Sequence, residues 1–319
     1  MIEPTIVTVT LNPSIDLPIA LNELHIGETN RCIESALDAG GKGINASRVI
    51  RRLGGNTVAY GFAGGITGAL LRKRLDEENV PHAFDEIEGL TRLDVMLFER
   101  SLNRRTRLLG EGPPIEARHL DGLRSRLASI PAGSYVVLGG SIPPGIAPTI
   151  YRDLVVWLNE RSVHCIVDIS GEALRDVLEA HPALIKPNEE EAGEAVGRAL
   201  SGETEILAAA RELRARGAQS VVISLGAQGA IGVTDNGAWK VDVPEVEVHS
   251  TVGSGDSMVG GLALSLNRGS SFVDAVALGA AAGTAAAMAA DRHLCHPPDV
   301  QDVLRRIRIR SFSSVLTSM

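Results

Sequence analysis

Short apolar runs alternate with longer stretches of helical spacing, and this alternation constrains the fold of the chain more than any other feature. The apolar runs are rich in β-branched residues and lie at 5–11, 57–64, 134–141, 163–170 and 220–226. Helical spacing of apolar residues is found at 44–55, 66–80, 146–160, 171–180 and 203–216. This order indicates βαβ units around a mostly parallel sheet whose two faces are both covered. We therefore expect an α/β fold.

Two regions interrupt the alternation. Residues 12–38 and 87–110 have strand-like runs with polar residues between them and contain no convincing helix. They predict a small sheet separate from the main layer, serving as a lid or an interface. The core would then consist of 1–11, 39–86 and 111–310, and residues 311–319 would form a loosely held tail.

Composition narrows the possible partners and compartments. The chain has 31 Lys and Arg against 39 Asp and Glu, a net charge of −8, so we expect no nucleic-acid surface and no membrane anchor. Its cysteines, Cys32, Cys165 and Cys295, are far apart and form no CxxC pair, which favours a reducing compartment such as the cytoplasm. The start of the sequence lacks signal-peptide features, and the Ala-rich run at 275–290 favours a buried helix over a membrane span.

The stretch STVGSGDSMVGG, residues 250–261, places a carboxylate where a glycine turn leads into a helix. Backbone N–H groups of Gly253, Ser254 and Gly255, with the positive end of the helix dipole, would form an anion site suited to phosphate. Asp256 beside it would accept a proton from a substrate hydroxyl during phosphoryl transfer. From this stretch alone, a simple helix cap explains Asp256 equally well.

A second glycine-rich stretch, DAGGKGINAS at 38–47, also precedes a helix. It is not a P-loop, because Ala36 stands where the first glycine is required and Gly43 follows Lys42. The formal Rossmann pattern from Gly41 to Ala46 lacks a strand directly before it. A turn and helix start explain most of the stretch, whereas Asn45 is a candidate for binding a polyol.

Charged residues form two further candidate groups. In LIKPNEEEAG, Lys186, Asn188 and Glu191 suit the phosphates and Mg²⁺ of a nucleotide, although an exposed acidic first helical turn is the better explanation in isolation. An arginine cluster in the expected small sheet suits a substrate phosphate, or equally a solvated strand face; it comprises Arg92, Arg100, Arg104, Arg105 and Arg107. The histidines show no metal-binding spacing, and no GxSxG motif supports a serine hydrolase.

Together these stretches resemble the ribokinase/PfkB family of sugar kinases. GGKGINAS at 40–47, followed by Gly54 and Gly64, matches the first family signature, and STVGSGDSMVGGLA at 250–263 matches the second. KPNEEE at 186–191 matches the family's Asn-x-x-Glu motif. The resemblance spans nearly the whole chain and is greatest to the hexose-phosphate branch: 1-phosphofructokinase, tagatose-6-phosphate kinase and the minor 6-phosphofructokinase. It implies a three-layer αβα sandwich with a small β-sheet lid, the use of ATP and Mg²⁺, and a homodimer formed through the lid.

The resemblance also implies a role for individual residues. It makes Asp256 the catalytic base, with Gly253, Ser254 and Gly255 as the anion hole. The implied sugar-phosphate site comprises Asp16, Arg31, Gly40, Gly41, Lys42, Asn45, Arg92, Arg107 and Ser141, with Arg31 reaching the site of a neighbouring subunit. The implied nucleotide site comprises Lys186, Asn188, Ser224, Gly226 and Gly229, and Glu191 would hold the metal ion.

Departures from the family pattern refine the expected substrate. Lys42 is typical of 1-phosphofructokinases and tagatose-6-phosphate kinases, and Thr29 replaces a lysine of the minor 6-phosphofructokinase. Asp94 stands where an uncharged residue is usual and would weaken phosphate binding unless it points away. Asp291 and His293 replace Gly and Arg at the monovalent-cation loop, which argues against potassium activation.

The expected activity is phosphorylation of fructose 1-phosphate to fructose 1,6-bisphosphate by ATP. Fructose 6-phosphate and tagatose 6-phosphate remain alternative acceptors. A non-catalytic sugar-phosphate sensor is a second hypothesis, suggested by Asp94. A kinase for nucleosides or unphosphorylated sugars is a third, but it would leave Arg92 and Arg107 without an anionic partner.

Overall fold

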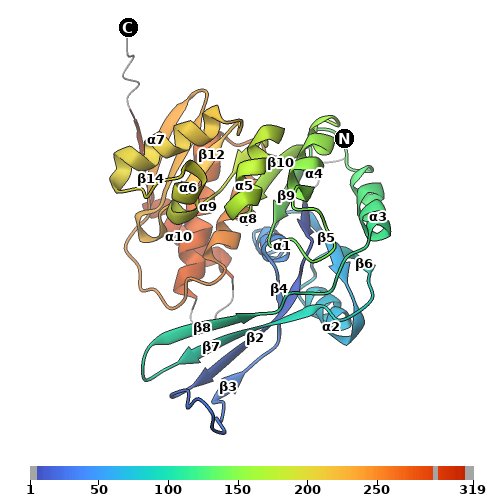
Figure 1. Cartoon of the computed structure of the whole chain (residues 1–319). Helices are drawn as coiled ribbons and strands as arrows, with labels where there is room; N and C mark the ends of the chain where they lie inside the picture. The colour runs from blue at the N-terminus through green and yellow to red at the C-terminus, as the bar shows by residue number, and fades with distance from the viewer. Residues whose placement is uncertain (1–5, 290–293, 313–319) are drawn as a thin grey trace.

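The computed structural model describes residues 6–289 and 294–312, and within them a ten-stranded sheet forms the centre of the molecule (Figure 1). Seven neighbouring strands, which begin with β6 at one edge of the sheet, run parallel to one another. Strands β13, β14 and β15 continue the sheet to its other edge, each antiparallel to its neighbour. The order is β6 (His82–Glu86), β5 (Thr57–Ala63), β1 (Ile6–Thr10), β9 (Tyr135–Gly139), β10 (His164–Asp168), β11 (Leu184–Ile185), β12 (Val221–Ser224), β13 (Ala230–Thr234), β14 (Gly237–Asp242) and β15 (Arg308–Ser311).

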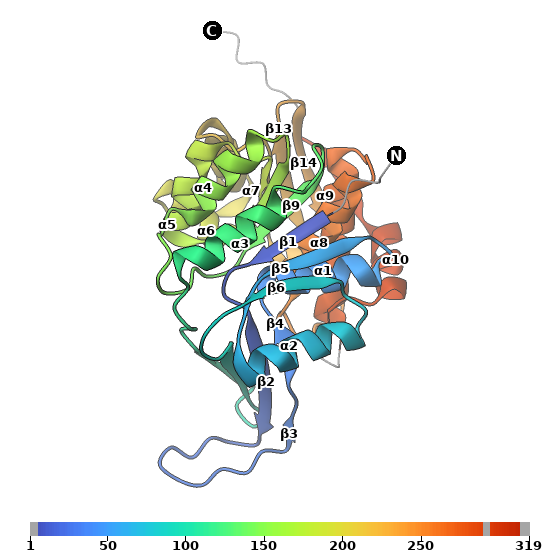
Figure 2. The ribbon, with the colours of Figure 1, turned by 90° about the vertical axis from the view of Figure 1, so that its right-hand side faces the viewer.

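Helices cover both faces of this sheet and complete a three-layer sandwich (Figure 2). One layer contains α3 (Ala117–Leu127), α4 (Ile150–Asn159), α5 (Gly171–Val177), α6 (Glu189–Val196) and α7 (Gly202–Ala215). The other contains α1 (Lys42–Arg52), α2 (Gly65–Glu77), α8 (Ser254–Asn267) and α9 (Phe272–Met288), with α10 (Pro297–Arg306) packed on α9. None of the helices in the described ranges combines the length and apolar character needed to cross a membrane.

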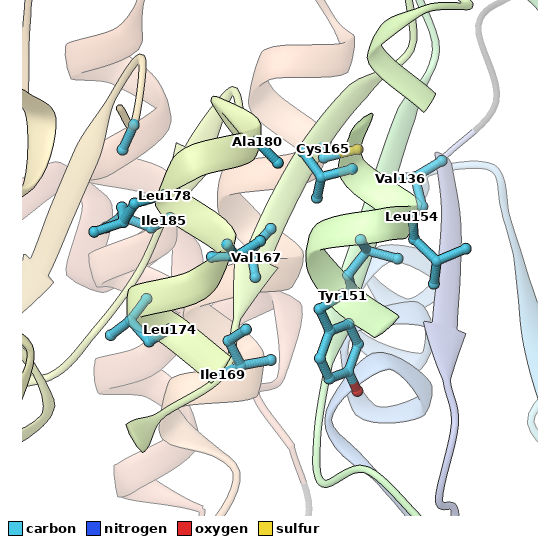
Figure 3. Close-up of a cluster of buried hydrophobic side chains, with 14 of the residues drawn as sticks. Val136, Tyr151, Leu154, Cys165, Val167, Ile169, Leu174, Leu178, Ala180 and Ile185 are labelled. Atoms are coloured by element: carbon cyan, nitrogen blue, oxygen red, sulfur yellow. The ribbon is translucent and has the colours of Figure 1, made fainter. Parts of the chain in front are cut away.

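The apolar strands serve both layers because successive side chains point to opposite faces. In β9, Val136 and Leu138 pack into the core under α4 and α5, whereas Val137 packs under α8 and α9. Figure 3 shows the first of these cores, where Cys165 and Val167 of β10 meet Leu154 and other side chains of the covering helices. This two-sided burial confirms the expected αβα sandwich and explains why these runs lack polar alternation.

A second sheet stands apart from the sandwich, as expected for a lid (Figure 1). It consists of β3 (Glu34–Ser35), β2 (Ser14–Leu21), β7 (Arg92–Glu99) and β8 (Arg104–Leu109) in that order, with β4 (Asp38–Gly40) also paired to β2. The register pairs Asp16 with Asp94 and Met96 with Arg107, so these four side chains share one face of the sheet.

The order of the large sheet fixes where a ligand can bind. The chain passes from β1 to β5 and β6 on one side, then returns to β9 on the other side of β1. In open parallel sheets, ligands bind at the carboxyl ends of the strands beside such a switch point. Asp168 ends β10 at this edge, and a Cβ placed on Gly139, the last residue of β9, would lie 3.3 Å from Lys42 Cβ.

The structure contains several elements that the sequence analysis does not predict. Strands β6, β13 and β14 and helices α3 and α10 were not anticipated, and β15 extends to Ser311, the first residue assigned to the tail. The start of α1 follows β4 directly, but β4 belongs to the small sheet rather than to a Rossmann unit. Asp291 and His293, on which the expectation about potassium rests, lie outside the described residues.

Candidate active site

Helix α8 begins directly after a glycine turn, and its first residues form the centre of the candidate site. Gly253 has a left-handed φ of 78°, which costs a residue with a side chain about 1–2 kcal/mol. The Ser254 N–H donates to a carbonyl oxygen of the preceding turn at 3.3 Å. The N–H groups of Gly255 and Asp256 have no acceptor among the described residues. Two free N–H groups at the positive end of a helix dipole suit an anion.

The Asp256 side chain lies beside these N–H groups and has a perturbed pKa. Its Oδ2 accepts a hydrogen bond of 2.8 Å from Asn45 Nδ2. Burial raises the pKa of Asp256 to about 6, and the negative charge of Asp168 adds to this rise. The Asn45 hydrogen bond and the ammonium groups of Lys42 and Lys186 act in the opposite direction. The carboxylate is therefore mostly ionised at neutral pH and basic enough to accept a hydroxyl proton.

Two lysines meet at one buried carboxylate close to the helix start. Asp168 Oδ1 lies 3.3 Å from Lys42 Nζ and 3.3 Å from Lys186 Nζ. Burial raises the pKa of Asp168, but the two lysines outweigh this effect, so the net pKa is lowered. A Cβ on Gly255 would lie 3.7 Å from Lys186 Nζ, so this ammonium group lies close to the start of α8. The arrangement places two ammonium groups where a phosphoryl group would be bound.

Lys42 remains a cation in this setting. Burial lowers its pKa, but the charges of Asp168, Asp256 and Glu191 outweigh burial, and the net pKa is raised. Its side chain is 35% exposed, so the ammonium group is accessible to a ligand while it holds Asp168.

A cleft separates the lid sheet from the starts of α1 and α8. It brings together four of the predicted site residues, Asp16, Asn45, Arg107 and Gly253. Burial raises the pKa of Asp16, whose Oδ1 accepts a hydrogen bond of 2.6 Å from Ser14 Oγ. The lid also contacts the sandwich here, because Arg105 Nη2 donates to the His249 carbonyl at 2.7 Å. Further lining residues include Asp38, Arg48, Met96 and Phe98.

Two glycines follow the cleft residues Asp38 and Ala39 and hold the start of α1 close to Asp16. A Cβ on Gly40 would overlap with the Asp16 carboxylate and the Ser14 hydroxyl, so only glycine leaves Asp16 in its place. Gly41 caps α1 with a φ of 124°, which also favours glycine. Both positions therefore require glycine, Gly40 for space beside Asp16 and Gly41 for its backbone conformation.

Arg92 and Asp94 form an ion pair at the root of the lid. Arg92 Nη1 lies 3.2 Å from Asp94 Oδ2, and both side chains are largely buried. Arg92 also donates to the carbonyls of Asn12 and Gly110, whereas its Nη2 has no partner among the described residues. The negative charge of Asp94 is thus neutralised by Arg92, and the Asp94 side chain does not point away from the expected phosphate site. Arg107 forms no ion pair within the described ranges, so its charge is available to a ligand.

Of the predicted substrate residues, six are not among those that line the cleft: Arg31, Gly40, Gly41, Lys42, Arg92 and Ser141. Arg31 is exposed in the connection from β2 to β3. Ser141 is also exposed, and its Oγ accepts a hydrogen bond of 3.1 Å from Asn12 Nδ2. Any role for Arg31 therefore requires another copy of the chain, as the family resemblance implies.

The predicted nucleotide residues lie along the edge formed by β11 and β12. Asn188 caps α6, and Ser224 ends β12 at an isolated bridge to Asn188. Gly226 begins the exposed turn Gly226–Gln228, which follows β12. A Cβ on Gly229 would overlap with the Val241 carbonyl, so Gly229 serves the packing of the turn rather than ligand contact.

Glu191 and Asn188 form a reciprocal capping box at the start of α6. Glu191 Oε2 accepts from the Asn188 N–H at 2.8 Å, and Asn188 Oδ1 accepts from the Glu191 N–H at 2.8 Å. Both residues thus cap α6, and Glu191 Oε1 has no hydrogen-bond partner among the described residues. The described residues contain no group of three carboxylate, histidine or cysteine side chains that could hold a metal ion. One free carboxylate oxygen is nevertheless compatible with Mg²⁺, which is commonly held by one or two carboxylates, water and substrate phosphates.

Sequence reasoning did not assign two residues that the structure places at this site. Asp168 lies in the strand predicted at 163–170 and ends β10, and an acid at the carboxyl end of a parallel strand is a recognisable signal. Arg48 lies one turn after Asn45 on α1 and contacts it, but an arginine in a helix has no distinctive sequence signal.

The sandwich, the lid and the charged helix start together define a phosphotransferase of ribokinase-like architecture. The family described as "pfkB family carbohydrate kinase" matches residues 9–296. The chain belongs to the pfkB family of carbohydrate kinases and is a sugar phosphotransferase.

Curated relatives carry three related names. The chain is 34% identical to a 1-phosphofructokinase of Borreliella burgdorferi over 95% of its own length and 98% of the relative. It is 36% identical to ATP-dependent 6-phosphofructokinase isozyme 2 of Escherichia coli over 93% and 97%. It is 32% identical to a tagatose-6-phosphate kinase of Staphylococcus epidermidis over 82% and 85%.

Solved structures agree with the fold. Phosphofructokinase-2 from Escherichia coli in complex with potassium has a TM-score of 0.90 and 35% identity, covering 94% of this chain and 98% of that one. A structure described as the tetrameric inhibited form of the same enzyme has a TM-score of 0.88, 35% identity and the same coverage.

Proposed function

We propose that the chain transfers the γ-phosphoryl group of ATP to a hydroxyl of a ketohexose monophosphate. The observation that carries this proposal is the start of α8, where a carboxylate with a pKa of about 6 lies beside two free backbone N–H groups and two lysines. This combination of a proton acceptor and an anion site matches what phosphoryl transfer requires.

In the proposed reaction, Asp256 accepts the proton of the acceptor hydroxyl as its oxygen bonds to the γ-phosphorus. The bond from this phosphorus to the bridging oxygen breaks, and ADP leaves. The N–H groups of Gly255 and Asp256 stabilise the charge on the migrating group, together with Lys42 and Lys186. These donors are already in place and need little reorganisation.

Mg²⁺ fits this proposal through the unused oxygen of Glu191, on the nucleotide side of the lysine cluster. Bound there with the ATP phosphates, the ion would neutralise part of their charge. Asn188 and Ser224 border the same edge, and Gly226 and Gly229 shape the adjacent turn.

The acceptor most consistent with the residues is fructose 1-phosphate, with fructose 1,6-bisphosphate as the product. Asp16 and Asn45 would bind sugar hydroxyls, while Arg107 and the free Nη2 of Arg92 would bind the existing phosphate. Lys42 favours fructose 1-phosphate or tagatose 6-phosphate over fructose 6-phosphate, because of its occurrence in those branches of the family.

A coupled assay of ADP release with a panel of acceptors tests the proposal. We expect turnover with ketohexose monophosphates, highest with fructose 1-phosphate, and little with fructose itself. Equal turnover with fructose would contradict a phosphate-binding role for Arg92 and Arg107. No ADP release with any member of the panel would contradict the kinase and favour a sensor.

We further propose a homodimer formed through the lid. Side chains on the lid face opposite the cleft are apolar and partly exposed, including Leu17, Leu93, Val95 and Leu108. Such a face favours burial against a second copy. A dimer of this kind would also give Arg31 access to a neighbouring site. Three unpaired cysteines, two of them buried, support the proposal of a cytoplasmic location.

A further inference from the structure

A buried arginine that was not predicted from the sequence contacts the asparagine that donates a hydrogen bond to the proposed base. Arg48 lies on α1, and only 3% of its surface is exposed. Its Nε donates to Glu78 at 2.9 Å, its Nη2 to Asp38 at 3.0 Å, and its Nη1 to the Ala39 carbonyl at 3.0 Å. The same Nη1 donates to Asn45 Oδ1 at 3.2 Å. The guanidinium is thus fixed on all sides, and one of its contacts is the amide that binds Asp256.

The chemistry of the three groups determines the orientation of the Asn45 amide. A guanidinium group only donates hydrogen bonds, and an ionised carboxylate only accepts them. Asn45 must therefore turn Oδ1 toward Arg48 and Nδ2 toward Asp256, as observed at 3.2 and 2.8 Å. The reversed amide would place an oxygen against the Asp256 carboxylate and an NH₂ group against the guanidinium.

We propose that Arg48 is a positioning residue, which holds the Asn45 amide in the one orientation that donates to Asp256. The inference rests on the proposed role of Asp256 as the base. Arg48 lines the cleft, but only 3% of its surface is exposed and all three guanidinium nitrogens already donate to protein groups, so its effect on the reaction is transmitted through Asn45.

The proposal predicts a specific change in the titration of Asp256. The charged groups facing Asp256 are Lys42 from α1, Lys186 after β11 and Asp168 from β10. None of them contacts Arg48, so a change at Arg48 leaves their charges in place. If the amide is free to reverse, the ionised carboxylate loses its donor and the protonated form is favoured. The pKa of Asp256 then rises.

The main variant is Arg48→Lys, which keeps the positive charge facing Glu78 and Asp38 but lacks the planar fork that also reaches Asn45. Arg52→Lys is the matched control. Arg52 pairs with Glu78 from the same helix at 3.2 Å but has no contact with Asn45. If Arg48→Lys does not fold, the double variant Arg48→Gln/Glu78→Gln is titrated in its place. It removes one positive and one negative charge together, so the net charge of the buried cluster is unchanged.

The measurement is a carboxyl ¹³C NMR titration of the free protein, with the Asp256 signal assigned by its loss in Asp256→Asn. We expect Arg48→Lys to raise the Asp256 pKa by about half a unit or more and Arg52→Lys to leave it unchanged. The pH at which kcat/KM is half-maximal should rise in parallel. Because the titration needs no substrate, it tests the positioning role even if wild-type protein fails to release ADP.

A double-mutant cycle separates positioning from a direct effect. In an Asn45→Ala background, Arg48→Lys should cause no further shift in the Asp256 pKa. An equal shift in both backgrounds, or no shift in the wild-type background, would overturn the proposal.

Discussion

Two neighbouring carboxylates have their pKa values moved in opposite directions. Burial dominates at Asp256 and raises its pKa to about 6, whereas Lys186 and Lys42 keep Asp168 ionised. Such a separation is typical of sites where one acid must exchange a proton and the other must stay charged. Asp168 accordingly anchors the two lysines, and Asp256 remains the group able to accept a proton.

The raised pKa of Asp256 predicts the pH dependence of turnover. Because the base must be ionised, kcat/KM should fall by about tenfold per pH unit below pH 6 and level off above it. The Lys42→Met variant distinguishes this limb from ionisation of the substrate phosphate. Removal of the positive charge raises the Asp256 pKa, so the limb should move to higher pH. A limb that stays in place in the variant, or a flat profile down to pH 5, would argue against Asp256 as the base.

At the scale of the helix, the start of α8 combines an anion site with a position that tolerates a methyl group. A Cβ on Gly255 would lie no closer than 3.7 Å to another group, Lys186 Nζ, which is an ordinary contact distance. Replacement of a helical glycine by alanine stabilises a protein by about 0.4–1 kcal/mol where the backbone permits it.

Gly255→Ala should therefore separate stability from activity. We expect Tm to be unchanged or slightly higher, while kcat falls by about tenfold or more, because the methyl group occupies space against Lys186 Nζ at the proposed phosphoryl site. Thermal unfolding and the ADP-release assay measure the two effects. Normal kcat in a stable variant would mean that the phosphoryl group is bound elsewhere.

Elements buried on both faces could be predicted from the sequence, and elements defined by pairing at the sheet edge could not. The strands that include Val137 and Val167 have apolar central residues, and the Ala-rich run became α9, as expected. The hairpin of β13 and β14 was missed, although its two-residue loop, Asp235 and Asn236, is a recognisable turn signal. Strand β15 depends on pairing with β14 across a long sequence separation, which local pattern does not reveal.

At the scale of the molecule, the candidate site assembles segments that are far apart in the sequence. The glycine-rich stretches identified Asn45 and Asp256, and the structure joins them by a hydrogen bond across 211 positions. The contacts of Asp168 and Arg48 arise only when α1, β10 and the segment after β11 are packed together. The sequence motifs therefore predicted the main groups of the site, but not the network that orients them.

The proposed dimer gives a prediction for the whole molecule. Leu108 is 59% exposed on the lid face opposite the cleft, and a charge there would be buried in the dimer without a partner. Leu108→Asp should convert the dimer to a monomer when mass is measured by light scattering after gel filtration. Ile66→Asp is the matched control, because Ile66 is 80% exposed on α2, outside the lid. Loss of the dimer in both variants, or in neither, would contradict an interface formed by this face.

The most direct test of the central claim is turnover and sugar binding by Asp256→Asn. Asparagine preserves the size of the side chain but cannot accept the hydroxyl proton, so kcat should fall by about 10²–10⁴-fold. Binding of fructose 1-phosphate, measured by calorimetry, should stay within about threefold of wild type, since Asp16, Arg107 and Arg92 are unchanged. Turnover within tenfold of wild type, with binding intact, would contradict the account of α8 as the site of phosphoryl transfer.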